Sequence, residues 1–269
     1  YFQAYKYHLL SMLTMNMGYQ VLLLVSIVTF GINSIGPLLS VFVKSLYFIA
    51  LLIILWYFFK DKNRVSFKGE ITFLNLIMLA RPMMIGGIVF QINNFVGQLL
   101  LSIYSKPENI SYFAVIMRVG IIMSFVFLAI MRVTTPKIAL LYKERKINEL
   151  EDVIIFSNRI MIIVSTMLLF FIIIFGKNIL SLFGNDFLSA YPMLIIIIVG
   201  QYIAANTGIS VFILQMTGYQ KINRNNIIIS TILSSVLGFV IIPVWGIMGT
   251  VIMTFISLLI VNTLAFYHV

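Results

Sequence analysis

The chain has 269 residues, of which 61% are hydrophobic and only 10% are charged. This composition excludes an ordinary soluble domain and is typical of a protein with many membrane spans. The 18 basic and 8 acidic residues give a net charge of +10, but most of the bases lie in short loops between apolar segments, which disfavours nucleic acid as a partner. Because the chain has no cysteine, disulfides, thiol catalysis and cysteine-based metal sites are excluded.

Apolar segments long enough to cross a bilayer follow one another along the whole chain. A span needs about 20 apolar residues. The sequence predicts eight such helices, over residues 9–30, 37–59, 76–103, 111–136, 153–175, 188–215, 225–243 and 247–267. Residues 139–158 mix charged with apolar side chains and predict a helical extension at the cytoplasmic surface. The predicted fold class is therefore an all-α, polytopic membrane protein.

Basic residues alternate between the predicted loops. The loops at 60–70, 137–152 and 216–224, together with the start of the chain, hold 11 Lys and Arg residues. The intervening loops hold only Lys106 and Lys177. Because basic loops stay in the cytoplasm, the pattern predicts that both ends of the chain are cytoplasmic.

Five cations lie inside the predicted helices, where the sequence has no acidic residue. Four of them, Lys44, Arg81, Arg118 and Arg132, are candidate site residues, and the fifth, Arg159, is expected to extend to the cytoplasmic headgroups. A charge at membrane depth costs at least about 2.5 kcal/mol, so it usually faces a cavity or a partner. Arg118 and Arg132 are 14 residues apart, which places them on nearly one helix face, about 21 Å apart. Arginine binds phosphate bidentately, so the pattern favours a pathway for an anion. The alternative is that each cation extends to a headgroup layer.

A stripe of small and polar residues runs along the predicted helix 76–103. Gly87, Gln91, Asn94 and Gln98 follow at steps of four, three and four residues, and therefore share one face. Facing a wet cavity, the three amides would bind sugar hydroxyls. The alternative is that they join neighbouring helices by hydrogen bonds.

The sequence shows no catalytic constellation. His8 and His268 lie near opposite ends of the chain, and the acidic residues are in or near loops. Neither a metal-ligand spacing nor a phosphate-binding glycine loop occurs. We therefore expect a protein that is not an enzyme and has no cofactor, while a coupling ion, H⁺ or Na⁺, remains open.

Several segments, in this order, resemble bacterial polysaccharide flippases. YFAVIMRVG at 112–120 and TPKIALLYKERKINEL at 135–150 resemble the eighth-helix region of that family and the loop after it. LFGNDFLSAYPMLIIIIVGQ at 182–201 resembles the next hairpin, and ILQMTGYQK at 213–221 resembles the L-x-x-T-G turn. IPVWGIMGTVIMTFISLLIVN at 242–262 resembles the final pair of helices. The similarity covers residues 70–269 well and residues 1–60 loosely.

This resemblance implies the O-antigen and capsule repeat-unit branch of the multidrug/oligosaccharidyl-lipid/polysaccharide exporter superfamily. Its members have a MATE-like fold of two six-helix lobes around a central cavity. On that map, residues 1–59 are the last two helices of the first lobe, 60–75 the cytoplasmic interlobe linker and 76–269 the second lobe, so four helices would precede Tyr1. Family members hold a lipid diphosphate with cavity Arg and Lys, a role that Lys44, Arg81, Arg118 and Arg132 would match.

The resemblance implies a flippase of the bacterial cytoplasmic membrane that moves undecaprenyl-diphosphate-linked oligosaccharide from the inner to the outer leaflet by alternating access. The implied partners are the bilayer, this lipid and other polysaccharide-assembly membrane proteins. Two alternatives stay open. A cation-coupled multidrug exporter of the same superfamily would place acids in its cavity, and a membrane glycosyl- or phosphotransferase would need clustered acids or histidines.

Overall fold

The computed structural model describes residues 42–43, 45–53 and 73–269. The chain divides into two compact units, residues 1–70 and residues 71–269, each described here by itself. In the first unit, residues 42–43 and 45–53 are helical, as predicted for this part of helix 37–59, and the rings of Tyr47 and Phe48 pack edge to face. The predicted helix 9–30, Lys44 and residues 60–72 of the predicted linker lie outside the described residues.

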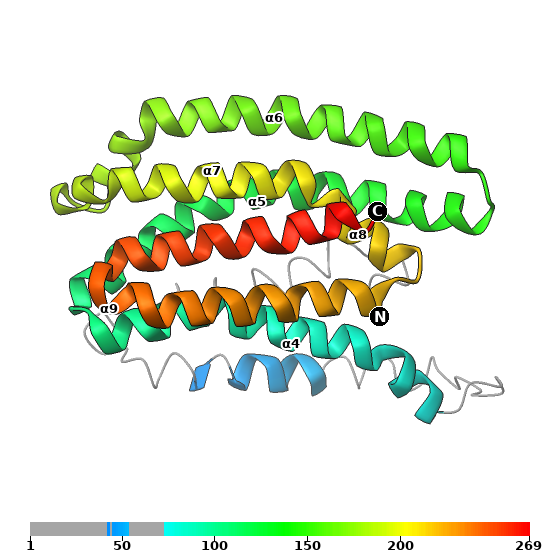
Figure 1. Ribbon diagram of the computed structural model, residues 1–269, viewed down its shortest axis with the longest axis horizontal. Coiled ribbons are helices and arrows are strands. Elements are labelled where there is room, and N and C mark those ends of the chain that lie inside the picture. The colour runs from blue at the N-terminus through cyan, green and yellow to red at the C-terminus, as the bar shows by residue number, and fades with distance from the viewer. Residues whose placement is uncertain (1–41, 44, 54–72) are drawn as a thin grey trace. The chain divides into compact units, whose positions relative to one another are not determined.

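The second unit consists of long helices packed side by side (Figure 1). Its elements are α4 (Phe73–Tyr104), α5 (Pro107–Lys143), α6 (Ile147–Ser181), the 3₁₀ helix η3 (Asn185–Ala190), α7 (Tyr191–Thr207), α8 (Ile209–Met216) and α9 (Gln220–Tyr267). Five helical segments in the described residues are long and apolar enough to cross a membrane. Because α9 runs out and back, the unit contains all six helices predicted between residues 76 and 267, and the all-helical membrane fold is confirmed.

The sharp bend in α9 is at Gly246, whose φ of 52° and ψ of −124° are not helical. A positive φ favours glycine because it has no Cβ, and a Cβ here would also lie 3.2 Å from Ser105 Oγ. The bend divides α9 into a first limb, residues 220–245, and a second limb, residues 247–267, which run in opposite directions (Figure 1). Pro243 lies inside the last turn of the first limb.

The predicted helix 188–215 is interrupted in the structure. Residues up to Ala190 form η3, and α7 and α8 are separated at Gly208. The side chains of Asn206 and Thr207 donate hydrogen bonds to the carbonyls of Tyr202 and Ile203, at 2.8 and 2.7 Å. Gly208 itself keeps φ and ψ of −66° and −15°, and its N–H donates to the carbonyl of Ala204 at 2.8 Å, so the interruption is confined to one residue.

The α5–α6 hairpin is longer than predicted at its turn. Helix α5 continues to Lys143 and α6 starts at Ile147. Residues 139–143 and 147–158 are helical, as predicted, and they extend α5 and α6 on either side of the turn at 144–146. In Figure 1 the hairpin turn reaches beyond the neighbouring α8–α9 turn.

The core of the second unit forms where α5 packs against α6 and α7, and where α4 and α7 pack against α9. Its largest fully buried side chains include Leu101, Ile116, Met123, Met161 and Leu194. Large apolar side chains also cover the outside: Phe125, Met167 and Val240 are each about two-thirds exposed. In a soluble protein such a surface would aggregate, whereas here it suits contact with lipid.

Candidate functional site

Arg118 and Arg132 lie on one exposed strip of α5. The helix is unbroken between them, and both side chains are exposed. The strip also carries Ile122 and Phe125, while Val119 and Met123 point into the core. At 1.5 Å per residue, the two arginines are about 21 Å apart along the axis.

The neighbouring helix α6 shows how deep each arginine lies. Thr134 on α5 and Ser157 on α6 share a hydrogen bond of 2.9 Å, which fixes the register of these antiparallel helices. Arg132 is then level with Arg159, two residues further from the turn on each helix. Arg118 is level with about residue 173, roughly 6 Å short of the level of Lys177 at 1.5 Å per residue.

The stretch of α6 between Arg159 and Lys177 has no charged residue and is about 27 Å long. This length is close to the roughly 30 Å of a bilayer's hydrocarbon core. Arg132 therefore lies at one edge of the apolar layer, as expected for a side chain that extends to headgroups. Arg118 lies about one turn inside the other edge.

Arg118 has no acidic partner among the described residues. The described carboxylates lie at or near helix ends: Glu108, Glu144, Glu149, Glu151, Asp152 and Asp186. None of them is within ion-pair distance of Arg118. A guanidinium in this position requires water, a headgroup or a bound anion to solvate its charge.

Helix α4 contributes a third exposed cation and the polar stripe. Arg81 is exposed and precedes the apolar segment Met84–Tyr104 by three residues, which places it at a membrane edge. Gln91, Asn94 and Gln98 are all exposed, and Asn94 Nδ2 lies 3.4 Å from the Gln91 Oε1 that accepts its hydrogen bond. The stripe therefore does not join the helices of the second unit.

A shallow, open hollow runs along the same helix, and its described lining comes from α4 alone. Its described lining is almost entirely apolar, with Ile88, Ile92, Phe95 and Leu99 among the side chains, and it includes Gln91 of the stripe. Helix α4 thus presents an amide stripe and an apolar hollow next to each other.

The polar residue that joins helices in this region is Asn93, which is not among the residues predicted from the sequence. Its Nδ2 donates to Ser257 Oγ at 2.8 Å, and its Oδ1 accepts from Ser234 Oγ at 3.2 Å and Ser257 Oγ at 3.1 Å. Ser230 Oγ donates to the carbonyl of Ser257 at 2.8 Å. Asn93 thus connects α4 to both limbs of α9. The spacing of Ser230 and Ser234, four residues apart in an apolar helix, was the available signal.

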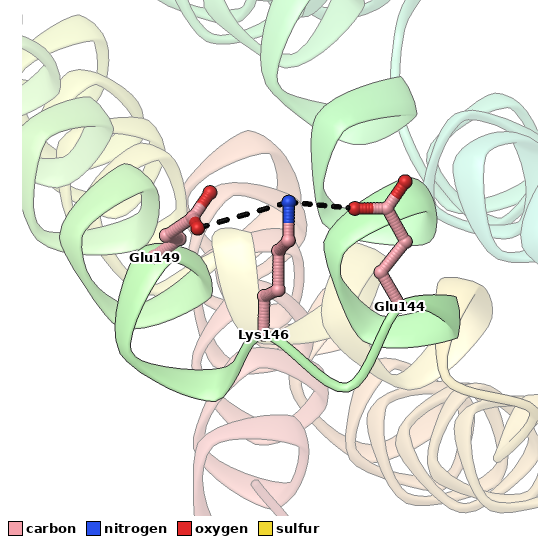
Figure 2. A network of polar contacts seen from close by, with 3 residues as sticks. All are labelled: Glu144, Lys146 and Glu149. Atoms are coloured by element: carbon pink, nitrogen blue, oxygen red, sulfur yellow. Dashed lines mark ion pairs between the residues drawn. The ribbon is translucent and has the colours of Figure 1, made fainter.

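The α5–α6 turn carries a solvent-exposed network of charges (Figure 2). Lys146 Nζ lies 3.1 Å from Glu144 Oε2 and 3.8 Å from Glu149 Oε1. The hydrogen bond to Glu144 and the attraction of both carboxylates raise the pKa of Lys146 above its ordinary value. Exposed pairs of this kind stabilise a fold little, and Figure 2 shows them on and beside the turn itself. Within the described residues, no group of three or more His, Asp or Glu side chains is placed to hold a metal.

The fold was compared with known proteins. No protein-family model matches the chain, and no curated protein matches it. Among solved structures, it is similar to a MATE transporter in the bent conformation, with a TM-score of 0.67 and 18% identity over 86% of this chain and 52% of that one. It is also similar to a multidrug resistance MATE family transporter of the MOP superfamily in an outward-facing conformation, with a TM-score of 0.58 and 16% identity over 87% and 56% of the two chains.

A third similar structure is a MOP superfamily transporter from Pyrococcus furiosus, with a TM-score of 0.62 and 19% identity over 71% of this chain and 43% of that one. The binding pocket of that protein has a reverse polarity, which suggests a different function for it. These likenesses show that the chain has the fold of MATE-type transporters. The chain spans about half the length of the transporters it matches.

Proposed function

We propose that the chain belongs to a membrane transporter of the MATE-like superfamily, and that its substrate is an anionic amphiphile, undecaprenyl-diphosphate-linked oligosaccharide. The protein would move this lipid from the inner to the outer leaflet of a bacterial cytoplasmic membrane. It would do so by alternating access of two lobes, without making or breaking a covalent bond.

The observation that carries the proposal is Arg118, a cation inside the apolar layer with no described acidic partner. A diphosphate would supply the missing charge, and the guanidinium fork matches its oxygens. Arg81 and Arg132 lie at the edge of the layer, on the side of the basic loops, where a lipid headgroup would enter. The exposed amides of Gln91, Asn94 and Gln98 suit sugar hydroxyls, and the apolar hollow beside them suits the lipid chain.

A second candidate is a cation-coupled multidrug exporter. It is favoured by the likeness to a multidrug resistance transporter. A pocket for organic cations needs carboxylates or aromatic faces without competing positive charge. The described spans carry arginines and no carboxylate in their apolar parts, so we rank this function second.

Transport by the whole protein in proteoliposomes separates the two candidates. A fluorescent polyprenyl-diphosphate oligosaccharide on one leaflet should become accessible to an impermeant lectin on the other leaflet faster than in empty vesicles. A cationic dye should cross no faster than in empty vesicles. Dye transport without lipid transfer would contradict the proposal and favour the multidrug exporter.

A further inference from the structure

Four buried polar residues form a continuous line along the first limb of α9. Asn223, Asn226, Ser230 and Ser234 follow at steps of three, four and four residues, so they share one helix face. Their exposed fractions are 4%, 2%, 1% and 0%. We call this line the polar seam. It starts near the beginning of α9, in the end of the unit that also contains the α5–α6 and α8–α9 turns (Figure 1).

The two serines of the polar seam are fully bonded within the protein. Ser230 Oγ donates to the carbonyl oxygen of Ser257 at 2.8 Å, and Ser234 Oγ donates to Asn93 Oδ1 at 3.2 Å. These bonds join the seam to the second limb and to α4. At the level of these serines, the polar side chains of α4 and of both limbs of α9 pair with one another, and they require no further ligand.

The two asparagines are different. Asn223 Oδ1 and Asn226 Nδ2 are buried and have no hydrogen-bond partner within the part of the chain that the structure describes. One atom is an acceptor and the other a donor, one helical turn apart. Buried polar groups of this kind are normally bonded to ordered water.

Thr135 on α5 also has a buried polar atom, Oγ1, without a hydrogen-bond partner among the described residues. It lies on the part of α5 that approaches the same end of the unit. Its neighbour Thr134 is bonded to Ser157. The other buried hydroxyls for which the structure gives contacts, such as Ser165 and Thr250, have partners.

We infer that water enters the second unit from this end and binds Asn223 and Asn226, accepting from one amide and donating to the other. Further along α9, Ser230 and Ser234 are bonded to Ser257 and Asn93, so the water does not extend beyond them. The hydrated site lies on the buried face of α9, whereas Arg81, Arg118 and Arg132 are exposed on α4 and α5. It therefore does not depend on the transported substrate.

Single cysteines test the inference, because the 269-residue chain contains none. Methyl methanethiosulfonate is small and membrane-permeant and reacts with the thiolate, which forms readily only where water solvates it. In proteoliposomes, Asn223→Cys and Asn226→Cys should react at least tenfold faster than Ser234→Cys, which lies on the same face. Thr135→Cys should likewise react faster than Thr134→Cys. Equal rates within both comparisons would overturn the inference.

Leucine variants give a second measurement that needs no labelling. Leucine has nearly the shape of asparagine without its polar atoms. If water satisfies the two amides, Asn226→Leu should lower the thermal midpoint, because a bonded group and its water are lost. A raised midpoint would mean that the amide is dry and unpaired, since removing an unsatisfied polar group stabilises a fold. That result would overturn the inference whatever the cysteine rates show.

Discussion

Asn93→Leu is expected to weaken the attachment of α4 to α9. Asn93 makes three side-chain hydrogen bonds, with distances of 2.8 to 3.2 Å, to Ser234 and Ser257. Hydrogen bonds inside membrane proteins contribute about 0.6 kcal/mol each on average and up to about 1.7. Ser234 and Ser257 keep other partners, the carbonyl of Thr231 and the hydroxyl of Ser230, so neither is left unsatisfied. The expected loss is therefore about 2 kcal/mol, without the larger penalty of an orphaned group.

The adjacent residue provides a matched control. Asn94 is exposed, and its described hydrogen bond, to Gln91, is long at 3.4 Å, so Asn94→Leu should change stability by less than about 0.5 kcal/mol. For a unit of about 200 residues, a loss of 2 kcal/mol lowers the thermal midpoint by roughly 4–8 °C. Size-exclusion chromatography after heating in detergent measures both midpoints. If Asn93→Leu melts with the native protein, or no lower than Asn94→Leu, the hydrogen-bond account of this junction is wrong.

Three further outcomes are expected. Cysteines at Asn109 and Asn185 should react with an impermeant maleimide from outside intact cells, and one at Arg145 only after permeabilisation, because basic loops stay in the cytoplasm; outside labelling at Arg145 would reverse the topology. Gly208→Ala should lower the thermal midpoint, because its Cβ would lie 2.6 Å from the Ala204 carbonyl oxygen. Gly87→Ala should leave the midpoint unchanged or raise it, since that Cβ meets nothing within 4 Å and alanine is the better helix former. An equal decrease of the thermal midpoint in the two variants would contradict the close packing at Gly208. The raised pKa of Lys146 predicts an NMR titration midpoint above 10.5 that falls in Glu144→Gln, and the ion pairs should stabilise the turn below this pH and lose that effect as the pH rises through the midpoint.

The six helices of the second unit could be predicted from the sequence because long apolar segments and the breaks between them are local signals. The interruption at Gly208 could not be predicted, because it is confined to a single residue within a long, mainly apolar segment. The helical extension over residues 139–158 could be predicted from its mixture of charged and apolar side chains, but the turn at 144–146 that divides it between α5 and α6 could not.

The polar residues show the limit of single-sequence reasoning most clearly. The stripe of Gln91, Asn94 and Gln98 was visible in the sequence, and the structure leaves it exposed. Asn93 was overlooked, although it makes the main contacts, because its partners Ser234 and Ser257 are 141 and 164 residues away. Asn223 and Asn226 lie near a basic loop and read as surface residues until the packing of α9 buries them.

The most direct measurement of the central claim is export of surface polysaccharide by cells carrying Arg118→Gln in the whole protein. If Arg118 binds the diphosphate, this variant should lose export while its membrane abundance stays near normal, and Arg118→Lys should restore export only in part, because lysine lacks the bidentate fork. Arg159→Gln is the matched control, since Arg159 lies at the membrane edge on α6 and should tolerate the change. Full export by Arg118→Gln would contradict an anionic pathway through this surface.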